Sequence, residues 1–282
     1  MPELPEVETV VSRLNEVLPN NVIKNVVVLR DKSFQGKVDD LIGSTIESVS
    51  RRAKIISINL DNGLRILVHL KMTGQLIYSS EEKKIGGGHP TSDWIKDLPS
   101  KHTRIEATLS DGKKLFFNDM RVFGWWKVVD DILAKKEFDK YGPDVNTDGF
   151  GLKYFLERLP KRNISIKQVV MDNKVVAGIG NIYASEALFL AGIHPERKAS
   201  GLSKKEAKKL FYLLKEVIED GIKSGGTTFD GKYVDIYGFS GSYQDKLRVY
   251  GQEGEPCLVC KNPVEKIKLG GRGSYYCRVC QK

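Results

Sequence analysis

The chain has 282 residues, enough for two domains or one large one, and 40% of them are hydrophobic, which is enough to build substantial cores. No apolar run is long enough to span a bilayer, the first residues are acidic rather than signal-like, and all four cysteines fall in the last 26 residues. A membrane protein and a disulfide-stapled fold are thereby excluded, and a cytosolic or nucleoid location is expected. The net charge of +9 favours an anionic partner, most often nucleic acid, although a merely basic globular protein has the same balance.

The amino terminus has two interpretations. Residues 1–9 read Met-Pro-Glu-Leu-Pro-Glu-Val-Glu-Thr, and apolar residues then recur at helical spacing as far as Leu18, which predicts an amphipathic helix. Proline and acids suit the first turn of any helix. Removal of Met1, however, would leave Pro2 as a secondary amine with a pKa of about 7.8, roughly 14% unprotonated at pH 7 and able to attack an aldehydic carbon. Glu3 stands beside this amine and could move protons.

Short β-runs dominate the first half of the chain, which predicts a β-sandwich. Strands are expected over residues 22–30, 45–49, 55–60 and 65–70. Asp61-Asn62-Gly63 is a strong hairpin turn between the last two of these strands. Arg51, Arg52 and Lys54 flank one strand, a pattern that fits a solvated sheet edge as well as a functional cluster.

Three further stretches complete this half. Residues 69–74 end a strand in a turn that carries Met72, although a methionine is more often buried than exposed. Residues 79–101 are polar and glycine-rich and are predicted to form a mobile loop, after which another strand opens. Residues 115–126 carry several aromatic side chains, most of which are assigned to the core of the sandwich.

The hydrophobic period becomes helical in the second half. Residues 130–150 are interpreted as a linker, and helices are predicted from 152, from 166 and over 203–223, the last with a capping box of Ser203 and Glu206. Residues 177–188 place two glycines before another helix. Backbone N–H groups at such a helix start can bind phosphate, although a plain helix–helix turn has the same pattern. Residues 229–245 are loop-like.

The last stretch predicts a metal site. Cys257 and Cys260 form one Cys-x-x-Cys pair, Cys277 and Cys280 form the other, and sixteen residues separate them. Two pairs at this spacing indicate one structural zinc ion held by four thiolates, because a redox role would suit a lone pair better. Arg272 lies at a glycine-rich hairpin tip between the pairs, where it could clamp phosphate or simply be solvated.

Four separated motifs together resemble the formamidopyrimidine-DNA glycosylase family, whose members repair oxidised purines in DNA. The motifs are Pro-Glu-Leu-Pro-Glu-Val-Glu-Thr at the amino terminus, His-Leu-Lys-Met-Thr-Gly at 69–74, Gly-Ile-Gly-Asn-Ile-Tyr-Ala-Ser-Glu-Ala-Leu at 178–188, and Gly-Gly-Arg-Gly-Ser-Tyr-Tyr-Cys at 270–277. The resemblance runs from Pro2 to the last cysteine pair, and the motifs occur in the family's order. It departs at Lys71, where the family usually has glycine, and at Met120 and Val122, where the family has proline and a second arginine. It also departs in the middle of 229–245, a region that often folds over the extruded base in the family.

The resemblance implies a set of catalytic and DNA-binding residues. Pro2 is implied to be the nucleophile, with Glu3, Lys54 and Arg272 handling protons or stabilising charge. Met72 is implied to fill the space of the extruded nucleotide, Arg121 to read the orphaned base, and Phe123 to wedge beside it. The remaining implied contacts to DNA or to the lesion come from His102, Arg162, Lys167 and Asn181.

The fold implied by these observations is α+β and multidomain. We expect an N-terminal catalytic β-sandwich with an opening helix over 1–130, a linker over 131–150, a helical domain with a helix–two-turn–helix motif over 151–250, and a four-cysteine zinc-ribbon hairpin over 251–282. The expected partner of this monomer is damaged double-stranded DNA, with no membrane and no redox cofactor.

Two other functions are compatible with parts of the sequence. An endonuclease VIII-like enzyme of the same fold would prefer oxidised pyrimidines, although the surroundings of Leu4 and Phe123 favour the purine enzyme. A non-catalytic zinc-ribbon DNA-binding protein would explain the charge and the cysteines but not the Pro2-Glu3 end. Retention of Met1 would favour this last alternative, because it blocks the amine.

Overall fold

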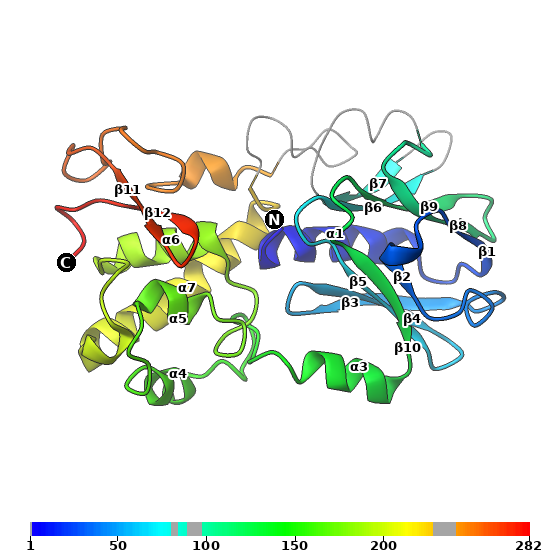
Figure 1. Cartoon of the computed structure of the whole chain (residues 1–282), viewed down its shortest axis with the longest axis horizontal. Coiled ribbons are helices and arrows are strands. Elements are labelled where there is room, and N and C mark those ends of the chain that lie inside the picture. The colour runs from blue at the N-terminus through cyan, green and yellow to red at the C-terminus, as the bar shows by residue number, and fades with distance from the viewer. Residues whose placement is uncertain (1, 80–83, 89–97, 228–240) are drawn as a thin grey trace. The chain divides into compact units, whose positions relative to one another are not determined.

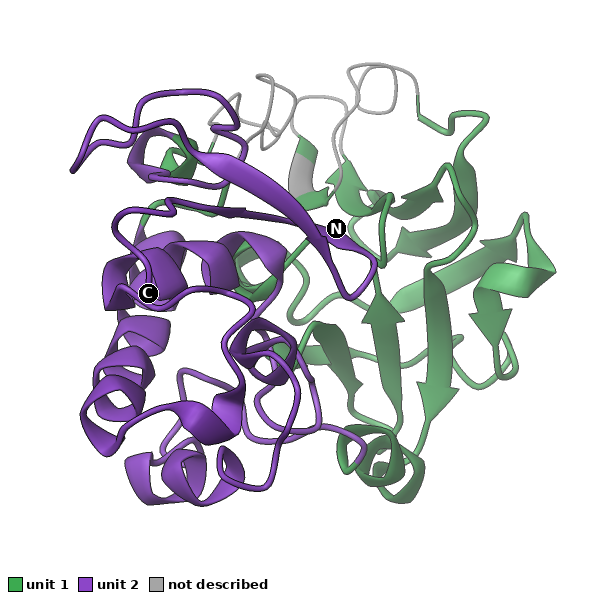
Figure 2. Ribbon diagram, turned by 60° about the vertical axis from the view of Figure 1, so that its left-hand side comes forward, with its two compact units in different colours: residues 1–139, 224–244 green, residues 140–223, 245–282 purple. Residues whose placement is uncertain are grey.

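A computed structural model describes residues 2–79, 84–88, 98–227 and 241–282. The described chain divides into two compact units (Figure 2). The first unit contains residues 1–139 and 224–244, and the second contains residues 140–223 and 245–282. None of the helices in these described ranges is long and apolar enough to cross a membrane.

The opening helix of the first unit, α1, spans Leu4–Val17 and begins with a capping box. Glu3 is its N-cap, and the side chains of Glu3 and Glu6 each accept the other residue's backbone N–H. Pro5 occupies the first turn, where a proline costs no hydrogen bond. The predicted apolar stripe of α1 is buried, so this helix contributes directly to the core.

The strands described in the first unit form two five-stranded sheets (Figure 1). One has the order β1-β8-β9-β6-β7 and is antiparallel throughout. The other has the order β2-β10-β5-β4-β3 and is antiparallel except between β2 and β10. The strands of the first sheet are β1 (Ile23–Val28), β6 (Gly74–Ser79), β7 (Lys84–Gly88), β8 (Thr103–Leu109) and β9 (Lys114–Asp119). Those of the second are β2 (Phe34–Gln35), β3 (Ile46–Arg52), β4 (Ile55–Leu60), β5 (Arg65–His69) and β10 (Trp125–Val129).

A single apolar core joins both sheets and α1. Phe117 and Leu76 contribute from one sheet, Trp126 and Val68 from the other, and Leu14 from α1. The helix packs against the edge strands β3 and β7, one from each sheet, and so closes one side of the sandwich. The predicted β-sandwich with an opening helix is confirmed, and so is the assignment of most aromatic side chains of residues 115–126 to its core.

Part of the predicted loop over 79–101 is instead strand β7, so the loop prediction is wrong at Lys84–Gly88. Two of the glycines that suggested a loop are required by packing. A Cβ on Gly87 would come within 2.9 Å of Val10 on α1, and one on Gly88 would come within 2.3 Å of the Gly74 carbonyl oxygen. Glycine here permits the close approach of a helix and a neighbouring strand.

The residues predicted to form a linker begin with a helix. Helix α3 spans Asp131–Phe138, is capped by the Asp130 side chain, and packs against β5 and β10. Helices of the second unit follow as α4 (Leu152–Arg158), α5 (Ile166–Val170), α6 (Asn181–Ala191) and α7 (Lys204–Lys223). The predicted capping box of α7 is present, since Ser203 and Glu206 exchange side-chain and backbone hydrogen bonds. Single 3-10 turns occur at Asp31–Ser33, Ala199–Gly201 and Tyr243–Lys246.

A two-stranded hairpin of β11 (Glu265–Leu269) and β12 (Arg272–Tyr276) completes the second unit. Gly270 and Gly271 form its two-residue turn, and both have the positive φ that such a tight hairpin turn requires. A small cluster of Phe189, Val249, Val264 and the cysteines joins the hairpin base to α6. The helical domain and the zinc hairpin are therefore present as predicted.

Candidate catalytic and nucleic-acid site

The predicted catalytic pair, Pro2 and Glu3, lies at the start of α1. Pro2 is buried and Glu3 is 4% exposed. The Glu6 carboxylate holds this end in place, because it accepts the Glu3 N–H at 2.9 Å and also the backbone N–H and hydroxyl of Thr227 at 2.8 and 3.0 Å. Met1 lies outside the described residues, so a free Pro2 amine remains a prediction. The residues 228–240 that follow Thr227 also lie outside, and with them most of the 229–245 loop.

Lys54 occupies a two-residue turn between β3 and β4 and is 5% exposed. The edge strand β3 is covered by α1, and the Arg51 guanidinium makes an ion pair with Glu8 on that helix at 2.5 Å. The solvated-edge interpretation is therefore wrong for Arg51 and Lys54. Because the ion pair joins the end of β3 to α1, the Lys54 turn is anchored to the helix that follows Pro2 and Glu3.

Met72 sits on the turn between β5 and β6, where its side chain is 38% exposed. The interpretation of Met72 as a core residue is therefore wrong. The Gly74 N–H donates to the Leu70 carbonyl across this turn, and a Cβ on Gly74 would lie 2.4 Å from that oxygen. Lys71 has a φ of +52°, the left-handed conformation that favours glycine. This backbone requirement explains why the family pattern has glycine at the position that Lys71 occupies here.

His69 stabilises the turn that carries Met72. Its Nδ1 accepts the Lys71 N–H at 3.0 Å, and its ring lies 5.7 Å from that of Trp125. Burial lowers the pKa of His69 to about 3, and the positive charges of Lys71, Lys54 and Lys127 contribute to this lowering. The imidazole is therefore neutral at physiological pH and acts as a hydrogen-bond acceptor.

Arg121 and Phe123 project from the turn between β9 and β10. Both side chains are accessible to solvent, and the guanidinium carbon of Arg121 lies 4.7 Å from the centre of the Phe123 ring. Such stacking is a favourable cation–π contact. The two side chains therefore form one exposed pair that combines an aromatic ring with a positive charge.

His102 and Arg104 lie at the start of β8, beside the same turn. The His102 carbonyl accepts the Asp119 N–H at 2.9 Å, and Arg104 Nε donates to the Asp119 carbonyl at 2.7 Å. Both side chains are half-buried. The structure thus gathers the predicted residues of β8 and of the Arg121 turn around one strand end.

In the second unit, Asn181 and Arg272 are brought together. Asn181 is the first residue of α6, after the N-cap Gly180, and its Nδ2 donates to the Gly273 carbonyl at 2.9 Å. Gly273 adjoins Arg272, whose side chain is exposed at the hairpin tip. A hydrogen bond therefore joins the helix start predicted to bind phosphate to the hairpin predicted to clamp it.

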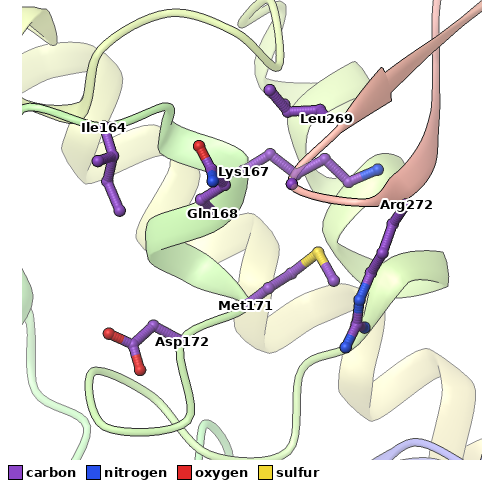
Figure 3. A pocket seen from close by; sticks show the side chains of 8 residues that line it. Ile164, Lys167, Gln168, Met171, Asp172, Leu269 and Arg272 are labelled. Atoms are coloured by element: carbon purple, nitrogen blue, oxygen red, sulfur yellow. The ribbon is translucent and has the colours of Figure 1, made fainter.

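Lys167 and Arg272 both line an open pocket of about 310 Å³ (Figure 3). Lys167 lies on α5, is 2% exposed, and donates from Nζ to Ser185 Oγ on α6 at 2.9 Å. Asp172 lines the pocket too, and it pairs with Arg162 at 3.4 Å. The second unit thus gathers its four predicted residues other than the cysteines in one region around α5, α6 and the hairpin: Arg162, Lys167, Asn181 and Arg272.

The four cysteines form one cluster whose ligand atoms all lie within 4.8 Å of one another. Two sulfur–sulfur distances are 3.9 Å, between Cys257 and Cys280, and 3.4 Å, between Cys260 and Cys277. A tetrahedral site with Zn–S bonds of about 2.3 Å needs sulfurs about 3.8 Å apart, so these residues fit a structural zinc ion. The backbone N–H of Asn262 lowers the pKa of Cys260 to about 6, which provides a thiolate at neutral pH, whereas burial raises that of Cys280 to about 12.

Three buried carboxylates escaped the sequence-based prediction. Glu6 holds Thr227, and Asp119 holds the turns that carry Met72 and Arg121. Glu186 on α6 accepts the N–H groups of residues 248–250 at 2.9 to 3.0 Å, and its burial raises its pKa. Their sequence signal is weak, because an acid on a helix or at a strand end is ordinarily solvated.

Three family models match the chain. They describe the formamidopyrimidine-DNA glycosylase N-terminal domain over residues 1–126, its H2TH domain over 141–232, and a zinc finger found in FPG and IleRS over 254–282. Formamidopyrimidine-DNA glycosylase of Listeria innocua is 39% identical over 289 residues, covering 100% of both chains. That of Desulforamulus reducens is 40% identical over 291 residues, covering 100% of this chain and 99% of its own.

Solved structures agree with these matches. A Lactococcus lactis FPG mutant, in complex with DNA that contains Fapy-dG, has a TM-score of 0.88 and 31% identity over 100% of both chains. The MutM (FPG) protein of Thermus thermophilus has a TM-score of 0.86 and 33% identity, covering 99% of this chain and 98% of its own. Full-length identity, three consecutive family domains and a shared fold lead to one conclusion: the chain belongs to the formamidopyrimidine-DNA glycosylase family.

Proposed function

We propose that this chain removes oxidised purines and formamidopyrimidines from duplex DNA and then cuts the abasic site, with Pro2 as the nucleophile. The observation that carries the proposal is the Pro2-Glu3 pair at the capped start of α1, in a chain that matches the glycosylase family from end to end. The helix start is buried and fixed by Glu6, and this supports the proposal because a nucleophile needs a defined position.

The proposed reaction begins when the damaged nucleotide leaves the base stack, because its sugar cannot otherwise be reached. The Pro2 nitrogen attacks C1′, and the base departs with the bonding electrons and a proton. The nitrogen then loses its own proton as the sugar ring opens, which leaves a C1′=N⁺ iminium and a hydroxyl group. The iminium acidifies the 2′ proton, so that β-elimination and then δ-elimination expel the two phosphates and cut the strand.

Glu3, Lys54 and Arg272 are the proposed assistants of this chemistry. Glu3 adjoins the amine and can take up and return protons. The Lys54 ammonium, on a turn anchored to α1, can protonate the leaving base or hold a phosphate. Arg272, exposed beside Asn181, suits a phosphate at the lesion, because its planar guanidinium donates paired hydrogen bonds.

The remaining predicted residues have proposed roles in binding the duplex. Met72 fills the vacated space in the stack, while Arg121 and Phe123 engage the orphaned base. Those that contact phosphate or the lesion are proposed to be His102, Arg162, Lys167 and Asn181. We also propose that the enzyme acts as a monomer in the cytoplasm, in association with the nucleoid, and we retain the division at 1–130, 131–150, 151–250 and 251–282 as part of the proposal.

The decisive experiment is borohydride trapping on a duplex with 8-oxoguanine opposite cytosine. The parent chain should form a covalent protein–DNA adduct, and Pro2→Gly should form almost none. Intact mass should show that the parent lacks Met1. Pro19→Gly is the matched control, because it makes the same substitution beyond the far end of α1 and leaves the amine in place. Tight binding without an adduct from a chain that lacks Met1 would contradict the proposed nucleophile.

A further inference from the structure

Asp119 ends strand β9 and is completely buried, yet its carboxylate serves two separate turns. Oδ1 accepts the hydroxyl of Thr73 and, at 3.2 Å, the N–H of Arg121. Oδ2 accepts the N–H groups of Phe123 and Gly124 at 2.8 and 2.7 Å. Four donors thus converge on one carboxylate, which compensates for removing its charge from water.

Thr73 is the point where the two turns meet. It follows Met72 in the turn between β5 and β6 and is 5% exposed. Its hydroxyl donates to Asp119 and also accepts the Arg121 N–H at 3.0 Å. The backbone that carries Met72 is therefore linked through one hydroxyl to the backbone that carries Arg121.

The backbone of the second turn needs this support. Val122 has a φ of +55°, a conformation that is costly for a β-branched residue and persists only where its surroundings enforce it. Gly124 closes the turn against the core, where a Cβ would lie 2.8 Å from the Phe117 ring and 2.9 Å from the His69 carbonyl. The bonds from Arg121, Phe123 and Gly124 to Asp119 enclose Val122 and hold it in this conformation.

From this arrangement we infer that Asp119 and Thr73 are positioning residues, which lock the Met72 turn and the Arg121–Phe123 turn into a single preorganised unit. Both residues are buried within the first unit. Their effect is to fix the spacing between the side chain that fills the stack and the side chains that meet the orphaned base. This inference rests on the proposed function, because the roles of Met72, Arg121 and Phe123 in the duplex belong to it.

The carboxylate is chemically suited to this task in a way that an amide is not. Each carboxylate oxygen accepts two donors, whereas an asparagine has one accepting oxygen and one donating nitrogen. In Asp119→Asn the amide nitrogen would have to face either Thr73 and Arg121 or Phe123 and Gly124. The hydrogen-bond donors of one turn would then lose their acceptor and face the donating amide nitrogen instead. We therefore expect Asp119→Asn to uncouple the turns.

The test compares duplex and single-stranded reactions of Thr73→Val, which removes only the shared hydroxyl. Single-turnover excision is measured on duplexes with 8-oxoguanine opposite cytosine and opposite adenine. Borohydride trapping is measured on a single-stranded abasic oligonucleotide, which needs the Pro2 amine but offers no opposite base. We expect excision opposite cytosine to fall by about 10- to 100-fold, the size of effect that a small misplacement produces, and the cytosine-to-adenine rate ratio to shrink. Single-stranded trapping should keep the parent rate.

Two variants separate positioning from general damage. Thr73→Ser retains the hydroxyl and should restore both the rate and the opposite-base ratio. Thr108→Val makes the same substitution on strand β8, away from either turn, and should behave as the parent. Asp119→Asn should lower duplex excision at least as much as Thr73→Val.

Two results would overturn the inference. One is a Thr73→Val enzyme with the parent's duplex rate and ratio. The other is an equal loss on duplex and single strand, because it would mean a structural defect rather than lost positioning. Failure of the proposed function has a different signature, since the parent itself would then form no adduct with the single-stranded abasic oligonucleotide.

Discussion

His69 shows how a single side chain can set both local geometry and pH response. Its neutral Nδ1 holds the Lys71 N–H, and the next residue of that turn is Met72. A protonated ring could not accept this bond, and it would be a buried cation near Lys54, Lys71 and Lys127. The neutral state of His69 is therefore part of the folded structure of the first unit.

Acid should destabilise the first unit through His69. Its pKa is about 3 in the folded chain and about 6.5 when unfolded, so between these values the unfolded chain holds the extra proton. The free energy of unfolding should consequently fall as pH drops below about 6.5, by up to about 1.4 kcal/mol per pH unit from this group, and His69 should contribute no slope above that pH. Asparagine can place an oxygen near the position of Nδ1 without titrating. Calorimetric Tm values at pH 7.5 and 5 should therefore diverge less for His69→Asn than for the parent, and equal losses would refute the assignment.

Site residues differ in how far the sequence can predict them. Pro2 and the cysteines carry their chemistry in their own motif, at the chain end or at a fixed spacing, and need no distant partner to be recognised. Asp119 joins its own turn to the Met72 turn only through Thr73, 46 positions away in the sequence, and this contact depends on the register of two strands. A single sequence contains no such register, so its contribution to the site was not predictable.

Strand β7 illustrates the same limit at the scale of elements. Apolar patterns correctly predicted α1, the strands β1, β3, β4, β5 and β8, and the helices of the second unit, because burial of a face imposes such a pattern. Lys84–Gly88 has no such pattern, since its glycines serve close backbone approach rather than side-chain burial. Its polar and glycine-rich composition therefore suggested a loop, although it is one of the two edge strands on which α1 packs.

Gly88→Ala should be far more destabilising than a glycine substitution in an open turn. A Cβ at Gly88 would lie 2.3 Å from the Gly74 carbonyl oxygen, which belongs to the strand that follows the Met72 turn, and its φ of +140° disfavours any side chain. We expect a loss of at least about 3 kcal/mol in the free energy of unfolding of the first unit. Gly112→Ala is the matched control, because its φ is also positive, at +78°, but nothing lies within 4 Å, and it should cost only about 1 kcal/mol. Urea titration of both variants measures the difference, and similar costs would disprove the packing account of β7.

At the scale of the whole molecule, the excess of nine positive charges falls on the second unit, because positive and negative residues balance in the first. Composition alone predicted an anionic partner but could not say which cations contact it. The structure distinguishes them by position. Arg272 is exposed at a hairpin tip bonded to Asn181, whereas Arg51 is engaged in an ion pair with Glu8. Only the former kind of cation is available to displace counterions from DNA.

Salt dependence should separate the charged contacts from the uncharged ones. Each phosphate neutralised by a cation contributes about −0.9 to the slope of log K against log salt concentration. Because Arg272 is exposed at the hairpin tip, its contact with a phosphate should contribute about −0.9 to the parent slope on a lesion duplex. Arg272→Ala should reduce its magnitude by about 1.

Met72→Ala should weaken binding by the same factor at every salt concentration, because an exposed thioether releases no counterion. Fluorescence anisotropy at several salt concentrations measures all three slopes. Equal slopes for Arg272→Ala and the parent would mean that the hairpin tip does not meet a phosphate, whereas a slope changed by Met72→Ala would mean that its turn positions a cation rather than filling the stack.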